Sequence, residues 1–114
     1  MPKRIQRVNS LLKKELSQIL LKEVEFPDNV LVTVTRVETS SNLFQSRIYI
    51  SVLPESQTKR VLTILEKIIY GLQQRINARL KMRPIPRIEF KREEKTEEAN
   101  KIEGLLEKIK KEHI

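Results

Sequence analysis

The sequence contains no cysteine and no tryptophan, only two glycines and a single histidine. Without cysteine there can be no disulfide, no thiolate metal ligand and no cysteine nucleophile. The histidine, His113, is next to the last residue, where chain ends usually fray. No phosphate-binding loop of the GxxxxGK[ST] type occurs. We therefore expect no catalytic residue, no metal, no cofactor and no small-molecule substrate.

Long apolar runs are also absent. The N-terminal stretch MPKRIQRVNSLL is basic but has no apolar core, and no segment is long enough to span a membrane. At 114 residues the chain is large enough for one modest hydrophobic core. We expect a single domain over 1–114 that is cytoplasmic, monomeric in solution and independent of membranes.

Aromatic residues are few, at 4% of the chain, and no cluster among them predicts a platform for stacking bases. Phe26 and Phe90 are expected in the core, whereas Tyr70 would be a candidate for contact with RNA if the partner is a nucleic acid. Recognition of a nucleic acid would then depend on phosphates and RNA shape more than on stacking.

Positive charge is plentiful and concentrated in one place. The net charge is +8, and residues 75–92 hold seven Lys and Arg against one Glu, which is 7 − 1 = +6. Residues 93–114 hold five against seven, which is 5 − 7 = −2. A concentrated basic patch is typical of a protein with a polyanionic partner. A merely solvated charged face is the alternative.

Apolar periodicity predicts the secondary structure. The spacing from Ile5 to Leu20 predicts a helix over 4–24, and that from Val61 to Leu80 predicts a second over 57–82. VLVTVTRVET and SRIYISVL predict an antiparallel hairpin. The apolar phase slips between Val34 and Val37, which indicates either a β-bulge or burial on both faces.

Two features mark the end of the second helix. Gly71 lies inside it, and a mid-helix glycine usually indicates a kink or a close backbone approach, so we predict a helix break there. Arg83 and Ile85 each precede a proline, which disfavours helix and should end it near Met82. RIEF then predicts a third strand, and 93–114 predicts an acidic, lysine-rich helical extension.

The predicted order is helix, strand, strand, helix, kink, helix, strand, followed by a C-terminal helix. It predicts a two-layer α+β fold with a three-stranded sheet, arranged like a type II KH domain. KH domains clamp RNA with a GxxG loop. Because Gly71 and Gly104 are the only glycines, that clamp is impossible here.

Three segments together resemble the ribosome-binding factor A family: RIQRVNSLLKKELSQIL, VTVTRVETSSNLFQSRIYISVL and LKMRPIPRIEF. The family's Ala-x-Gly at the helix break corresponds to Ile69-Tyr70-Gly71, and its usual small Ala corresponds to Ser46. The resemblance implies a KH-like factor that binds the maturing small (30S) ribosomal subunit and its RNA near the neck. It further implies a role in late RNA processing and in adaptation to cold, exerted through binding and not through chemistry.

The candidate RNA-binding residues are all basic, since arginine can hold a phosphate bidentately and stack on an unpaired base. They are Arg4, Arg7, Lys14, Arg75, Arg79, Lys81, Arg83, Arg87, Lys91 and Arg92. The main alternative is a general KH-like binder of single-stranded RNA that is not dedicated to ribosomes; an enzyme is a distant third.

Overall fold

The computed structural model describes residues 3–94, in which two α-helices cover one three-stranded sheet. The elements in chain order are α1 (Lys3–Lys22), β1 (Leu31–Thr39), β2 (Gln45–Leu53), the 3-10 helix η1 (Glu55–Gln57), α2 (Thr58–Arg79) and β3 (Arg87–Arg92). The predicted α+β class and three-stranded sheet are confirmed. Apart from Glu93 and Glu94, the predicted C-terminal extension lies outside the described residues.

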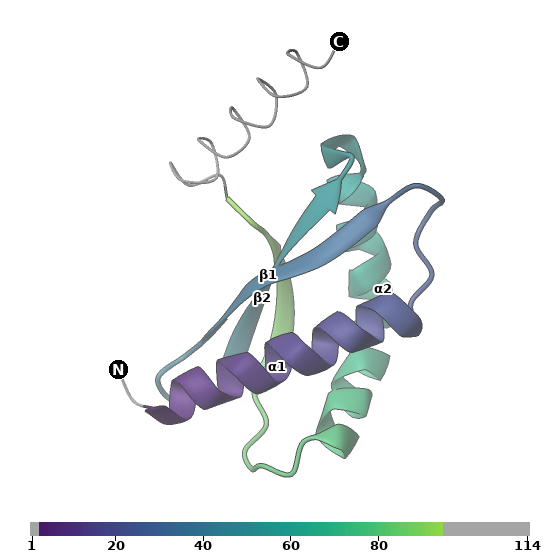
Figure 1. Ribbon diagram of the computed structural model, residues 1–114. Helices are drawn as coiled ribbons and strands as arrows, with labels where there is room; N and C mark the ends of the chain where they lie inside the picture. Colours follow the sequence, from purple (N-terminus) through teal and green to yellow (C-terminus); the bar gives the residue numbers. More distant parts are fainter. Residues whose placement is uncertain (1–2, 95–114) are drawn as a thin grey trace.

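The sheet is mixed and has the strand order β1-β2-β3. β1 and β2 form the expected antiparallel hairpin, whereas β2 and β3 pair in parallel. Parallel neighbours need a long crossover connection, and α2 supplies it. In Figure 1, α1 and α2 run in steeply crossed directions, and the connection from α2 to β3 lies at the bottom of the view.

The core lies between the helices and one face of the sheet. α1 buries the stripe that its sequence predicts, and all three strands turn alternate apolar side chains toward it. The fully buried large side chains on these elements include Leu12, Leu16, Ile19, Ile48, Ile50, Leu65, Leu72 and Ile76. Removing this apolar area from water is the main source of stability for the fold.

A β-bulge lies at Thr35. Val34 pairs with Ile50, but the next aligned pair is Arg36 with Tyr49, so Thr35 is the extra residue. The bulge restores the inward phase at Val37, which explains why Val34 and Val37 are both buried despite odd spacing. Of the two explanations for the phase slip, the bulge is correct.

A chain of polar side chains, of which only Ser46 is fully buried, joins α1, β1 and β2. Ser46 of β2 is fully buried, and its hydroxyl lies 2.7 Å from Thr39 Oγ1 of β1. The Thr39 hydroxyl in turn donates to Asn9 Oδ1 of α1 at 2.5 Å. The serine that stands in place of the family's small alanine therefore has a hydrogen-bond partner, as a buried hydroxyl requires.

The break predicted at Gly71 is not present, because α2 is one continuous α-helix from Thr58 to Arg79. Gly71 is exposed, does not have a positive φ, and nothing lies within 4 Å of where a Cβ would stand. Glycine costs a helix about 1 kcal/mol relative to alanine, and burial of the nearby Leu72 and Ile76 outweighs this cost. The helix also ends three residues before the predicted Met82.

Candidate RNA-binding surface

The segment between α2 and β3 is an extended connection held down at both ends. Leu80 caps α2 in an extended conformation, and its N–H still donates to the Ile76 carbonyl at 3.0 Å. Leu80 and Pro86 are buried, and Met82 and Ile85 pack partly against the core. The chain bends at Arg83 and Pro84, and the residues between these anchors, Lys81, Arg83 and Pro84, are exposed.

The outward positions of this connection are basic. Lys81, Arg83 and Arg87 are all exposed. No ion pair joins any of them to another residue of the described part of the chain, and the Arg83 side chain donates to the neighbouring Met82 carbonyl at 2.8 Å. We call Lys81, Arg83 and Arg87 the basic junction. No carboxylate within residues 3–94 forms an ion pair with these three side chains.

The beginning of α1 lies against the basic junction. Arg4 Nη2 donates to the Arg83 carbonyl oxygen at 3.4 Å across 79 positions of sequence. Arg7 follows Arg4 by almost one helical turn and is exposed. Lys14 is also exposed, but at 1.5 Å per residue it lies about 15 Å along α1 from Arg4. The structure thus joins Arg4 to the junction and places Lys14 farther from it.

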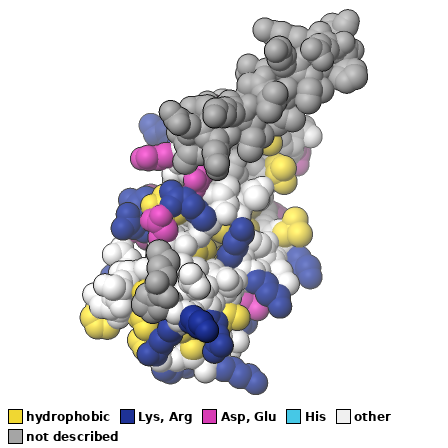
Figure 2. Space-filling view, turned by 60° about the vertical axis from the view of Figure 1, so that its left-hand side comes forward, with side chains coloured by type: hydrophobic (Ala, Val, Ile, Leu, Met, Phe, Trp, Pro, Cys, Tyr) yellow, Lys and Arg dark blue, Asp and Glu magenta, His cyan; other side chains and the backbone are white. Residues whose placement is uncertain are grey.

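Basic side chains gather visibly at this end of the molecule. Figure 2 shows Lys and Arg side chains clustered at the bottom of the view. Figure 1 places the connection from α2 to β3 at the same end, below the N-terminal end of α1. Several nearby cations raise the local potential more than isolated ones and attract a polyanion.

The two arginines near the C-terminal end of α2, Arg75 and Arg79, have different surroundings. Arg79 is bound by acidic residues of and after α1, with Nη2 2.8 Å from Glu23 Oε2 and Nη1 3.8 Å from Glu15 Oε2. Arg75 is exposed and lines a hollow together with Glu23 and Glu25. Arg79 therefore ties α2 to α1, and its charge is largely compensated.

The two basic residues at the end of β3 are also paired. Lys91 Nζ lies 2.9 Å from Glu89 Oε1, and Arg92 Nη2 lies 2.6 Å from Glu55 Oε1. Arg92 lies five positions after Arg87 in the strand, which is about 16 Å of extended chain. The structure therefore leaves Lys91 and Arg92 apart from the basic junction.

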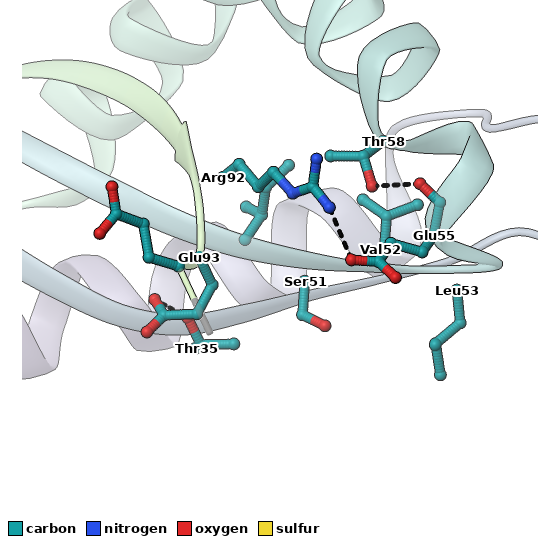
Figure 3. A pocket seen from close by; sticks show the side chains of 10 residues that line it. Thr35, Ser51, Val52, Leu53, Glu55, Thr58, Arg92 and Glu93 are labelled. Atoms are coloured by element: carbon teal, nitrogen blue, oxygen red, sulfur yellow. Dashed lines mark hydrogen bonds and ion pairs between the residues drawn. The ribbon is translucent and has the colours of Figure 1, made fainter. Parts of the chain in front are cut away.

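The pocket beside Arg92 is acidic, as Figure 3 shows. Glu55, Glu93 and Glu94 line it together with Thr35 and Thr58, and its volume is about 200 Å³. Glu93 Oε2 accepts a hydrogen bond from Thr35 Oγ1 at 2.8 Å. Carboxylates at this density disfavour a phosphate, so the pocket is a poor anion site.

One basic residue outside the predicted set has an unusual environment. The Arg36 guanidinium lies 3.8 Å from the centroid of the Tyr49 ring and binds Glu93 at 3.0 Å. Partial burial opposes its charge, but the Glu93 hydrogen bond and the Glu38 charge raise the pKa of Arg36. Arg36 of β1 and Tyr49 of β2 are direct cross-strand partners because the bulge at Thr35 shifts the register by one residue. The sequence alone does not reveal this pairing.

The described residues show neither a cluster of metal-ligating side chains nor a membrane-spanning helix. No group of three or more His, Cys, Asp or Glu residues within 3–94 is arranged to hold a metal ion. No helix in the described region is long and apolar enough to cross a membrane. His113 lies outside the described residues.

Comparison with known proteins identifies the family. The sequence model described as ribosome-binding factor A matches residues 4–106. The chain belongs to the ribosome-binding factor A family. It is 36% identical over 110 residues to ribosome-binding factor A of Halothermothrix orenii, covering 96% of this chain and 90% of the relative. It is 38% identical over 107 residues to that of Brevibacillus brevis, covering 93% and 88%.

Solved structures of the same family share the fold. The crystal structure of ribosome-binding factor A from Thermus thermophilus superimposes with a TM-score of 0.68 at 25% identity, covering 77% of this chain and 93% of that one. A homology model of the Thermus thermophilus factor, fitted into an electron cryomicroscopy map of its 30S complex, gives a TM-score of 0.51 at 26% identity. It covers 73% of this chain and 88% of that one. The KH-like fold expected from the resemblance is thereby confirmed.

Proposed function

We propose that this protein is an assembly factor that binds the maturing small ribosomal subunit and its ribosomal RNA. It acts near the neck of the subunit, assists late processing and maturation of the RNA, and matters most in the cold. Membership of the ribosome-binding factor A family supports the ribosomal partner. A relative fitted into a map of its 30S complex supports the small subunit.

The observation that carries the proposal is the contact between Arg4 and the Arg83 carbonyl. It brings the start of α1 to the basic junction and concentrates positive charge on one end of the domain. Arginine presents a planar fork that fits a phosphate, and an extended connection anchored in the core limits the motion of its side chains. Less conformational entropy is then lost on binding than for a free loop.

The mechanism is binding and not catalysis. The described residues offer cations, exposed aromatic rings and backbone groups to an RNA, and the candidate surface contains no nucleophile paired with a base. We expect the protein to work as a monomer in the cytoplasm, where it would stabilise one conformation of the RNA.

Sedimentation with purified ribosomal particles tests this function. The protein should co-sediment with small subunits and not with large subunits at a salt concentration near 150 mM, where weak nonspecific contacts are screened. Equal binding to both subunits and to any single-stranded RNA would instead support a general RNA-binding module. Cells without the protein should accumulate immature small subunits, above all at low temperature.

A further inference from the structure

Two aromatic side chains stand out from the surface beside the basic junction. Tyr70 of α2 is 77% exposed, and Phe44, just before β2, is 69% exposed. Both line one hollow of about 640 Å³, and Arg87 lines it as well. Exposing two large aromatic rings to water in one hollow is unfavourable, so such a pair commonly marks a binding surface.

The backbone around Phe44 holds its position. Its N–H donates to Asn42 Oδ1 at 3.1 Å, and its carbonyl accepts from the Arg87 N–H at 2.9 Å. The preceding Leu43 has a φ of 63°, in the left-handed region that a leucine rarely adopts. Strain of this kind persists where the surrounding contacts enforce it, and here they fix Phe44 beside Arg87.

The side of the hollow formed by α2 is equally well held. Gln73 Nε2 donates to the Pro86 carbonyl at 3.1 Å, and its Oε1 accepts from the Ile88 N–H at 2.8 Å. Gln73 and Ile88 both line the hollow, so this bridge forms part of its wall. Because α2 is tied to β3 here, Tyr70 and Arg87 stand on one rigid unit.

The acidic residue of the hollow is already compensated. Glu89 Oε1 lies 2.9 Å from Lys91 Nζ, and Glu89 Oε2 accepts from Gln45 Nε2 at 2.7 Å. The hydrogen bond from Lys91 lowers the pKa of Glu89 and so favours its charged form. Arg87 remains the cation of the hollow that has no described carboxylate partner.

We propose that this hollow holds one unpaired RNA base against the rings of Phe44 and Tyr70, with an adjoining phosphate at Arg87. The proposal rests on the proposed function, since it names a subsite for the same RNA. Stacking on aromatic rings with an arginine beside them is a common way to hold an unpaired base of either RNA or single-stranded DNA. It would add to the phosphate contacts an interaction that salt does not screen.

An apolar side chain of a protein partner is the other occupant to consider. An apolar partner favours a hollow without charge, but here Arg87 adjoins the rings and belongs to the basic junction. A nucleotide complements both features, because it has a flat base and a negative phosphate. The charge at the rim therefore favours RNA.

Replacing the rings by leucine tests the proposal. Phe44→Leu combined with Tyr70→Leu keeps the surface apolar but removes both planar faces, whereas Phe44→Tyr with Tyr70→Phe keeps them. We expect the leucine pair to weaken binding to purified small subunits roughly tenfold or more, with an unchanged dependence on salt, and the aromatic swap to bind like the wild type. Leu21→Ala and Leu53→Ala, at exposed apolar positions outside the hollow, are the matched controls.

The outcomes separate this inference from the proposed function. If the wild type does not bind small subunits, the proposed function fails. If the wild type binds and the leucine pair binds equally well, the base subsite is wrong while the function stands. Thermal unfolding of each variant shows whether a loss of binding reflects a loss of folding.

A fluorescence titration distinguishes a base from an apolar side chain. The chain contains no tryptophan, so Phe44→Trp introduces a single indole that a stacked base would quench. Single-stranded RNA should quench it in a saturable way, and a strand of equal length without bases should not. Absence of quenching by RNA that binds would overturn the proposal, and so would equal quenching by the strand without bases.

Discussion

Arg4 Nη2 and the carbonyl oxygen of Arg83 lie 3.4 Å apart, although 79 positions separate the two residues in the sequence. The contact places the first turn of α1 beside the connection that leaves α2. Folding therefore brings the basic start of α1 and the basic junction, which are far apart in the sequence, onto one surface. Because the acceptor is a neutral main-chain carbonyl, this contact does not neutralise the positive charge of Arg4 or of Arg83.

Replacing Gly71 by alanine should stabilise the protein. The helix is continuous at this position and open space surrounds the site of the added Cβ, so Gly71→Ala should raise the free energy of unfolding by roughly 1 kcal/mol. Binding to small subunits should not change. Chemical denaturation and subunit sedimentation measure the two effects. A destabilised variant that also binds weakly would show that a bend at Gly71 matters after all.

Arg79 should contribute to folding more than to RNA binding. Its bonds to Glu23 and Glu15 lie at the surface, where each pair is worth about 0–1 kcal/mol. Arg79→Gln should therefore lower the free energy of unfolding by less than about 1 kcal/mol. A double-mutant cycle with Glu23→Gln should reveal coupling between the two side chains. Subunit affinity that falls as far as in a basic-junction variant would assign Arg79 to the interface instead.

Glu89 should make stability depend on pH in acid. Its folded pKa is lowered by the Lys91 hydrogen bond, whereas in the unfolded chain it lies near the ordinary 4.5. The stabilisation is therefore present above 4.5 and is lost as pH falls through the lowered folded value. The melting temperature of the wild type should exceed that of Glu89→Gln at neutral pH and equal it in strong acid. A difference that persists in acid would exclude the charge as its cause.

Binding to the small subunit should weaken as the salt concentration rises. The dependence should be less steep than if all ten basic candidates each contacted a phosphate. Arg79, Lys91 and Arg92 are held by carboxylates of the same chain. If about five phosphates are neutralised, the logarithm of the binding constant should fall with the logarithm of salt with a slope of roughly −3.5 to −4.5. A slope near zero, measured by sedimentation at several salt concentrations, would contradict a basic interface.

The apolar patterns predicted the elements because burial dominates their formation. The stripes of α1 and α2 and the inward residues of the strands lie where their periodicity placed them. The sequence did not distinguish a bulge from two-sided burial between Val34 and Val37, because both give the same apolar spacing. The strand register shows the bulge. At Gly71 propensity predicted a break, but the burial of the neighbouring Leu72 and Ile76 maintains the helix.

The site was predictable in composition and less so in arrangement. The charges at Arg83 and Arg87, each next to a proline, could be placed on the surface from sequence, because the prolines end the helix and charged side chains are rarely buried without a partner. The pairing of Arg79 with Glu23 could not, because it depends on how α1 packs beside α2. Phe44 was missed since an apolar residue before a strand usually points into the core.

Charge reversal in the basic junction tests whether this surface binds the small subunit. Arg83→Glu with Arg87→Glu should reduce affinity for purified small subunits by orders of magnitude with little change in melting temperature, because both side chains are exposed. The matched control is Lys59→Glu with Arg60→Glu, which reverses two exposed charges in the first turn of α2, where acidic residues suit the helix dipole. We expect near wild-type binding for the control. Equal losses in both double variants would contradict binding through the basic junction, because they would show that the attraction is diffuse.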